Sequence, residues 1–304
     1  MTVTIYKSTD GSAPVLSGQA GKLVDLLDAI LVNGYGAKPS QGWSIAYTDT
    51  NKRVYRLPTG TTQFYLRVDD TGTTDGRLRG WEVKADINDS VDANNTGPFP
   101  TDAQVSGGLY MYKSSTANAT ARAWQCYGNG KIFYLNIDVA GDGSTLRAMA
   151  FGDFTSYKSG DAYNCIIIAN NSVAGARFPL LSNNSALTGH YVPRSYTQSG
   201  GSLNVGKHSA QEGGTSGMGY AGITYPNAAD TMLYIGRVVI HEVTGYVQRG
   251  FLPGCWSPCH ARPIAHFDTY AGAGALSGKT FESINSWEGS IGACQVHYET
   301  SDTW

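Results

Sequence analysis

Charged residues are scarce in this sequence, at 15% of 304 residues, and neither sign predominates, since the formal net charge is −2. No block or stripe of Lys and Arg stands out. Because phosphate binding requires clustered basic side chains, we expect no nucleic-acid partner. The low charge does not indicate disorder, because disordered chains combine high charge with few aromatic residues and this chain has 19 tyrosines.

Long hydrophobic runs are also missing. No stretch reaches about 18 apolar residues, the length needed for a transmembrane helix, so we expect no membrane partner. The opening stretch "MTVTIYKSTDGSAP" lacks the basic and then apolar layout of a signal peptide. We therefore expect synthesis in the cytoplasm without export by the usual route.

Enzyme motifs are missing as well. The sequence has no Gly-x-Ser-x-Gly elbow, no phosphate-binding loop followed by Lys, and no His-Glu-x-x-His. Paired carboxylates such as Asp69 with Asp70, or Glu82 with Asp86, could serve a glycosidase. A chain with 24 acidic residues contains such pairs by chance. We therefore expect no catalytic residues and no enzyme.

Cysteine is limited to five residues, an odd number for a disulfide framework, in a chain long enough to bury a core without disulfides. Cys126 and Cys165 lie in strand-like runs, where we expect small buried hydrophobic side chains. The remaining three are the sharpest chemical feature of the chain. Cys255-x3-Cys259 and Cys294-x2-His297 have the spacing of a Cys3His zinc site, with His260 as an alternative ligand.

Glycine and tyrosine are abundant, and 38 glycines together with the tyrosines indicate a turn-rich β protein. Short alternating or apolar runs are separated by turn signals such as "TGTTDG", "GNG" and "GDGS", with no helical crossovers between them. This spacing predicts a mainly β, antiparallel fold, sandwich-like or barrel-like, with long Gly/Ser-rich loops. The runs include "GWSIAYTD", "QFYLRVDD", "RGWEVKAD", "GGLYMYKSS", "KIFYLNIDVAG", "RAMAFGDF", "NCIIIAN" and "TMLYIGRVVIHEV".

One N-terminal segment has the helical period. In "SGQAGKLVDLLDAILVNGYG" the apolar positions follow the i, i+3, i+4, i+7, i+8 pattern and predict an amphipathic helix of about four turns. Ser17 is the candidate N-cap, and Asn33-Gly34 ends the helix after Val32. The apolar stripe is our candidate for packing or assembly and consists of Leu23, Leu26, Leu27, Ile30 and Leu31.

Composition divides the chain into four parts. Residues 1–36 hold the helix, residues 37–199 form a β-rich core, and residues 223–304 form a β-rich C-terminal part packed on that core. Between them, residues 200–222 are rich in Gly and Ser and lack periodicity. We expect either a flexible loop or an arm that becomes ordered against a neighbouring subunit.

Several long stretches resemble structural proteins of tailed-bacteriophage and prophage virions. The resemblance covers essentially the whole chain and is carried by "SAPVLSGQAGKLVDLLDAILVNGYGAKPSQGWS", "FYLRVDDTGTTDGRLRGWEV", "GPFPTDAQVSGGLYMYKSS", "AFGDFTSYKSGDAYN", "RGFLPGCWSPCHARP" and "ETSDTW". It implies a place in the virus particle after synthesis in the bacterial host cytoplasm, and it carries over no catalytic residue. The implied partners are other virion proteins, either the major capsid protein or neck and tail proteins, together with further copies of the chain.

The resemblance brings no metal site with it, so we expect no cofactor. The favoured interpretation of "GCWSPCHARP" becomes a packed turn in which Leu252-Pro253-Gly254 make a sharp bend and Trp256 anchors it by burial. The cysteines would then fill small apolar gaps, and a disulfide stays open as an alternative.

The sequence leaves three candidate functions. A head decoration or cement protein is slightly favoured over a neck, tail or baseplate component. The alternative from another class is a carbohydrate-binding β-protein that recognises a receptor, in which aromatic side chains stack on sugars. The repetitive β-helix rhythm typical of tailspike enzymes is absent from the sequence.

Overall fold

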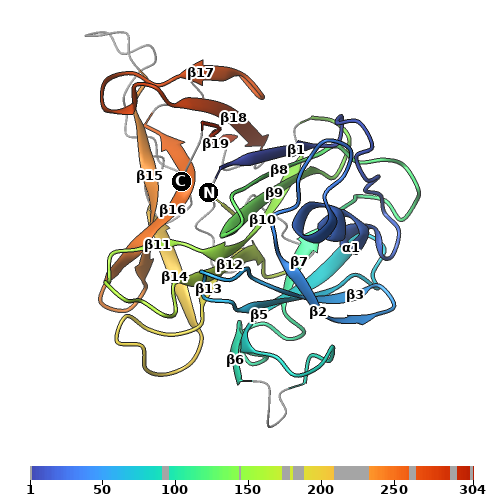
Figure 1. The fold of residues 1–304 in the computed structure, drawn as a ribbon, viewed down its shortest axis with the longest axis horizontal. Helices are drawn as coiled ribbons and strands as arrows, with labels where there is room; N and C mark the ends of the chain where they lie inside the picture. The colour runs from blue at the N-terminus through green and yellow to red at the C-terminus, as the bar shows by residue number, and fades with distance from the viewer. Residues whose placement is uncertain are drawn as a thin grey trace.

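The computed structural model describes residues 2–90, 96–143, 145–172, 179–180, 188–208, 233–259, 265–287, 293–301 and 304. The fold is mainly β with antiparallel pairing, as predicted, and the strands form an open sheet system with one short helix (Figure 1). The strands divide into a central, an N-terminal and a C-terminal sheet.

The central sheet is buried on both faces. Its strands pair antiparallel in the order β1 (Thr4–Lys7), β8 (Trp124–Gly128), β9 (Ile132–Asp138), β10 (Leu146–Asp153) and β12 (Cys165–Asn170). Every residue of β8, β9 and β12 is buried. Because both faces are covered, these strands carry near-continuous apolar runs instead of a strict alternation with polar residues.

The N-terminal sheet curls away from the central one. Tyr110 of β7 pairs with Asn170 of β12 and joins the two sheets. From there the order is β7 (Leu109–Tyr112), β5 (Asp75–Val83), β4 (Tyr65–Asp69), β3 (Lys52–Arg56) and β2 (Ser44–Asp49), with β6 (Thr96–Phe99) also on β5.

The C-terminal sheet covers the other face of the central sheet. It continues from β12 through β13 (Thr188–Val192), β14 (Leu203–His208), β15 (Ile235–Glu242), β16 (Gln248–Pro258), β19 (Ala293–Glu299), β18 (Thr280–Trp287) and β17 (Thr269–Ala271). The short strand β11 (Thr155–Ser156) pairs with β16, and a 3₁₀ turn, η2 (Gly274–Leu276), follows β17.

Alternation along the central strands separates two hydrophobic cores. On β9, Phe133 and Leu135 face the core shared with the helix and the N-terminal sheet. Ile132 and Tyr134 face the core shared with the C-terminal sheet. Cys126 and Cys165 are fully buried in the first core, which confirms the prediction of small hydrophobic side chains.

The helix is shorter than predicted. The α-helix α1 spans Lys22–Leu27 and continues as a π-helical segment, η1 (Asp28–Asn33). The predicted start at Ser17 is wrong, because Gly21 in the left-handed region (φ 83°) is the N-cap residue. The π-helical segment ends at Asn33, one residue beyond the predicted end at Val32, and Gly34 follows it with φ 73°. The five apolar side chains of the stripe, Leu23, Leu26, Leu27, Ile30 and Leu31, are all fully buried in the first core.

The predicted Gly/Ser-rich loop over residues 200–222 differs at its start. Leu203–His208 form β14 and pair with both β13 and β15. Val205 is buried in the second core and Leu203 packs against it, so two apolar side chains anchor this strand between its two neighbours. The remainder of the predicted loop, from residue 209, lies outside the described residues.

Candidate assembly surface

The structure places two of the candidate zinc ligands, Cys255 and His297, on different faces of one sheet. Cys255 pairs with Tyr298 across the β16–β19 ladder, and Trp256 pairs with His297. Successive residues of a strand point to opposite faces of the sheet, so Cys255 and His297 lie on opposite faces. Cys255 is buried in the second core, whereas the ring of His297 contacts Tyr270 with centroids 5.4 Å apart.

The other zinc candidates do not restore the site. Cys259 is half-buried just after β16, and its backbone N–H donates to the carbonyl of Tyr234 at 2.7 Å. The side chain of Cys294 and all of His260 lie outside the described part of the chain. Within the described ranges, no three His, Cys, Asp or Glu side chains come together as a metal ion would require. The four cysteines that the structure describes are free thiols.

The residues of the predicted turn, Leu252-Pro253-Gly254, lie within the range of strand β16 but interrupt its pairing with β15. Arg237 pairs with Trp256 and Val239 pairs with Phe251, so four residues of β16, Leu252 to Cys255, lie opposite the single residue Val238. This interruption of the ladder accommodates a proline, which cannot donate to a ladder, and a glycine with positive φ, here 65° at Gly254. Trp256 is 9% exposed and packs edge-on against Phe281, so its predicted burial is confirmed.

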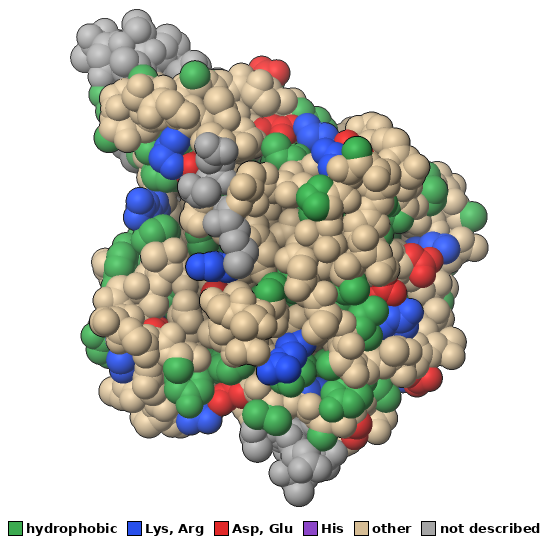
Figure 2. All heavy atoms as spheres, viewed as in Figure 1, with side chains coloured by type: hydrophobic (Ala, Val, Ile, Leu, Met, Phe, Trp, Pro, Cys, Tyr) green, Lys and Arg blue, Asp and Glu red, His purple; other side chains and the backbone are tan. Residues whose placement is uncertain are grey.

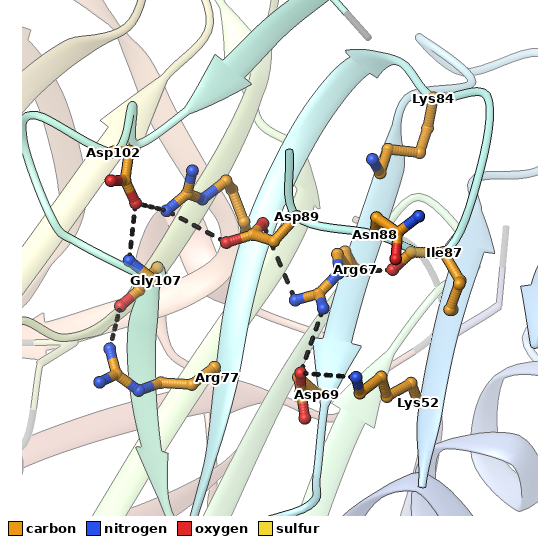
Figure 3. A network of polar contacts seen from close by, with 12 residues as sticks. Lys52, Arg67, Asp69, Arg77, Lys84, Ile87, Asn88, Asp89, Asp102 and Gly107 are labelled. Atoms are coloured by element: carbon orange, nitrogen blue, oxygen red, sulfur yellow. Dashed lines mark hydrogen bonds and ion pairs between the residues drawn. The ribbon is translucent and has the colours of Figure 1, made fainter. Parts of the chain in front are cut away.

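An ion-pair lattice covers the outer face of β3–β5 (Figure 3). Arg67 lies 3.1 Å from Asp69, and Asp89 lies 3.7 Å from Arg67 and 3.4 Å from Arg79. Arg67 also donates to the carbonyl of Ile87 at 2.8 Å. The two arginines therefore form ion pairs with carboxylates. The lattice also holds the segment around Ile87–Asp89 against the sheet.

Large apolar side chains are exposed on three neighbouring loops at one end of the molecule. We define the aromatic surface as Tyr157, Tyr196, Val243, Tyr246 and Val247. Tyr246 is 71% exposed and Tyr157 is 53% exposed. The loops follow β11, β13 and β15, and they lie together at the lower left of Figure 1. Exposed apolar clusters of this kind are typical of protein interaction sites, where tyrosine is enriched.

Buried Arg249 joins the three loops beneath the aromatic surface. Its guanidinium lies 3.2 Å from Asp161 and 3.1 Å from Glu242, and it donates to the carbonyl of Arg194 at 2.8 Å. These three partners come from the three different loops. Arg249 is fully buried, so its charge is compensated by two carboxylates in a dry environment.

Further hydrogen bonds fix the exposed tyrosines. The N–H of Tyr157 donates to the carbonyl of Arg249 at 2.8 Å, and the N–H of Tyr196 donates to Glu242. Lys158 donates to the carbonyl of Tyr196 at 2.7 Å, with its ammonium 5.1 Å from that ring. The backbone at Tyr157 and Tyr196 is therefore held in place, which lowers the ordering cost of binding in this part of the aromatic surface.

Neither sequence spacing nor composition singled out this surface, because its members lie on loops up to 90 residues apart between Tyr157 and Val247. On the face shown in Figure 2, Lys and Arg are scattered among Asp and Glu without forming a continuous basic area. No described helix has the length and apolar character needed to cross a membrane. No protein-family model matches the chain, and no curated protein is significantly similar to it.

Proposed function

We propose that this protein is a structural component of a tailed-bacteriophage virion and acts by protein–protein assembly. The observation that carries the proposal is the aromatic surface: three tyrosines and two valines exposed on loops that Arg249 holds together. The resemblance of the sequence to virion proteins supports the same function. Head decoration is the favoured role, and a neck, tail or baseplate position is the alternative.

The partners of the aromatic surface are proposed to be a second copy of this chain or a neighbouring virion protein. Rigid aromatic side chains lose little conformational freedom on binding and dominate the energy of many interfaces. The two hydrophobic cores on either side of the central sheet support the finer proposal of a sandwich-like architecture.

The experiment compares the wild-type chain with Tyr246→Ser and with Tyr157→Ser. Both side chains are more than half exposed, so both variants should keep the wild-type melting temperature. We expect each variant to lose self-association or incorporation into particles, measured by light scattering and by the amount of the chain in purified virions. A matched control is Val15→Ser, which is 60% exposed on a different part of the chain.

The copy number in purified particles separates the two positions. Head decoration requires on the order of hundreds of copies, whereas a neck or tail ring requires about a dozen or fewer because such rings have cyclic symmetry. Absence of the chain from particles, or full incorporation of both tyrosine variants, would contradict the proposal.

A further inference from the structure

A second feature of the molecule is a cavity of about 300 Å³ between the central sheet and the segment that leads into β17 and β18. Its apolar walls include Trp124, Leu146 and Ile284. Its polar groups come from β9, which contributes Asn136 and Asp138, and from His266. The volume is at the lower end of the range for small-molecule sites, roughly 300–1,000 Å³.

His266 lines this cavity and has an unused hydrogen-bond donor. Its Nδ1 accepts the backbone N–H of Asn285 at 3.0 Å, so the proton of the neutral ring lies on Nε2. Burial lowers the pKa of His266 and favours that neutral form. Nε2 is itself buried and has no hydrogen-bond partner among the residues that the structure describes.

Asn136 presents a second unused group. It is 2% exposed, and its Oδ1 accepts a hydrogen bond from the hydroxyl of Tyr298 at 3.3 Å. Its Nδ2 is buried without a partner in the described part of the chain. Rotating the amide exchanges the two atoms, so in either orientation one amide atom of Asn136 is left for a ligand. Unsatisfied buried polar groups are costly and point to a bound group that satisfies them.

Asp138 supplies acceptors in the same cavity. Its two carboxylate oxygens accept the backbone N–H groups of Gly141 at 2.8 Å and of Gly143 at 2.9 Å. Each oxygen keeps a further lone pair, because a carboxylate can accept about four hydrogen bonds. The turn therefore fixes the carboxylate in place and leaves it able to accept from a ligand.

Phe267 lies at the mouth of the cavity and is 45% exposed. Its φ of 66° is in the left-handed region, which is strained for a bulky side chain. A hydrogen bond of 2.7 Å from its N–H to the carbonyl of Ser283 holds this conformation. The result is an aromatic ring positioned beside the polar groups.

We propose that this cavity binds one neutral hexopyranose residue. Hydroxyl groups both donate and accept, so adjacent hydroxyls of one sugar can satisfy His266, Asn136 and Asp138 together. The C–H face of the same ring can pack on Phe267. An apolar ligand would leave the three polar groups unsatisfied, and an anion would meet the carboxylate of Asp138. Lys7 does not offset that charge, because it is paired with Glu282 at 2.8 Å.

The site is independent of the aromatic surface, so this inference goes beyond the proposed assembly function. The test is saturation-transfer NMR on the full-length chain with glucose, galactose, mannose and N-acetylglucosamine, each as the methyl glycoside and as the free reducing sugar, followed by titration of the intrinsic tryptophan fluorescence, to which Trp124 in the cavity wall contributes. At least one sugar should bind, with a Kd in the millimolar range. Binding of methyl glycosides indicates a residue within a glycan, whereas binding of reducing sugars alone indicates a free sugar, and both outcomes support the site.

Two variants and one control make the result specific. Phe267→Gly removes the ring and suits the positive φ, so the chain should fold and Kd should rise about five- to tenfold. His266→Ala should weaken binding by a similar factor. Tyr246→Ser should leave sugar binding unchanged while assembly is lost, so the two proposals can fail separately. Absence of saturation transfer from every sugar, or an unchanged Kd in Phe267→Gly, would overturn the inference.

Discussion

The carboxylate of Asp70 accepts a hydrogen bond of 2.7 Å from the backbone N–H of Leu23, 47 positions earlier in the chain. It also accepts the N–H of Val24 at 3.3 Å, so one side chain satisfies two unpaired donors at the start of the helix. Lys113 donates to the same carboxylate, and both side chains of this ion pair are fully buried. A residue distant in sequence therefore determines where α1 begins.

Removing this carboxylate should destabilise the fold. Burial raises the pKa of Asp70 to about 6, against the lowering effect of Lys113, so the group is ionised at neutral pH. Asp70→Ala would leave the ammonium of Lys113 buried and uncompensated, and we expect the free energy of unfolding to fall by about 3–5 kcal/mol. Urea denaturation at neutral pH measures the loss. The control is Asp70→Ala combined with Lys113→Met, which should recover part of it, and equal losses in the two variants would contradict this account.

The buried histidine His297 should make stability depend on pH. Burial lowers its pKa to about 3, and neither ring nitrogen has a hydrogen-bond partner in the described ranges. The unfolded side chain titrates near about pH 6.5. Below that value the unfolded state binds the additional proton, so the stability contribution of His297 is lost as the pH falls from about 6.5 toward 3. Lowering the pH from about 7.5 to about 5 should therefore reduce the contribution of this histidine to the free energy of unfolding by about 2 kcal/mol.

The matched variant for that experiment is His297→Leu. Its unfolding free energy should decline with acidification by about 2 kcal/mol less than that of the wild type over the same interval. Burial also lowers the pKa of His190 to about 3, so the variant should retain the remaining acid sensitivity. Identical pH profiles for wild type and His297→Leu would show that the folded and unfolded states bind protons alike at this position.

Chelation should leave the C-terminal part folded. Cys255 packs with Tyr134 and Tyr298 in the second core, on the face of the sheet opposite to His297. We expect the melting temperature to be the same with and without EDTA, and elemental analysis to find no stoichiometric zinc. Cys255→Ala should lower the free energy of unfolding by about 1–2 kcal/mol, because only packing volume is lost. A large drop in melting temperature with EDTA would instead establish a structural metal.

The ion-pair lattice offers a comparison of two carboxylates on the same arginine. Asp89 lies between Arg67 and Arg79 and is 23% exposed, whereas Asp102 is 3.0 Å from Arg79 but 67% exposed. Asp89→Ala should lower the unfolding free energy by about 2 kcal/mol, because two buried arginines lose a partner. Asp102→Ala, the matched control, should change the urea midpoint much less, since water screens its charge. A larger loss for Asp102→Ala than for Asp89→Ala would show that exposure of the carboxylate does not determine how much each ion pair stabilises the fold.

The sequence by itself determined the β-rich antiparallel class, because alternation and turn residues act over a few positions. It also determined the apolar stripe from Leu23 to Leu31, the glycine that follows the helical segment at Gly34, and the burial of Cys126 and Cys165. Each of these follows from the local period of apolar side chains or from the conformational freedom of glycine.

Only the tertiary structure decided the features that depend on distant contacts. Asp70 accepts the N–H groups at the start of the helix, which lies at Lys22 and not near Ser17, and the predicted bend at Leu252-Pro253-Gly254 lies within the range of β16. The aromatic surface exists because Arg249 gathers three loops, and the cavity beside Phe267 exists because β9 meets the segment before β17. Spacing along the chain cannot determine such sites, since which face of a strand is covered depends on what packs against it.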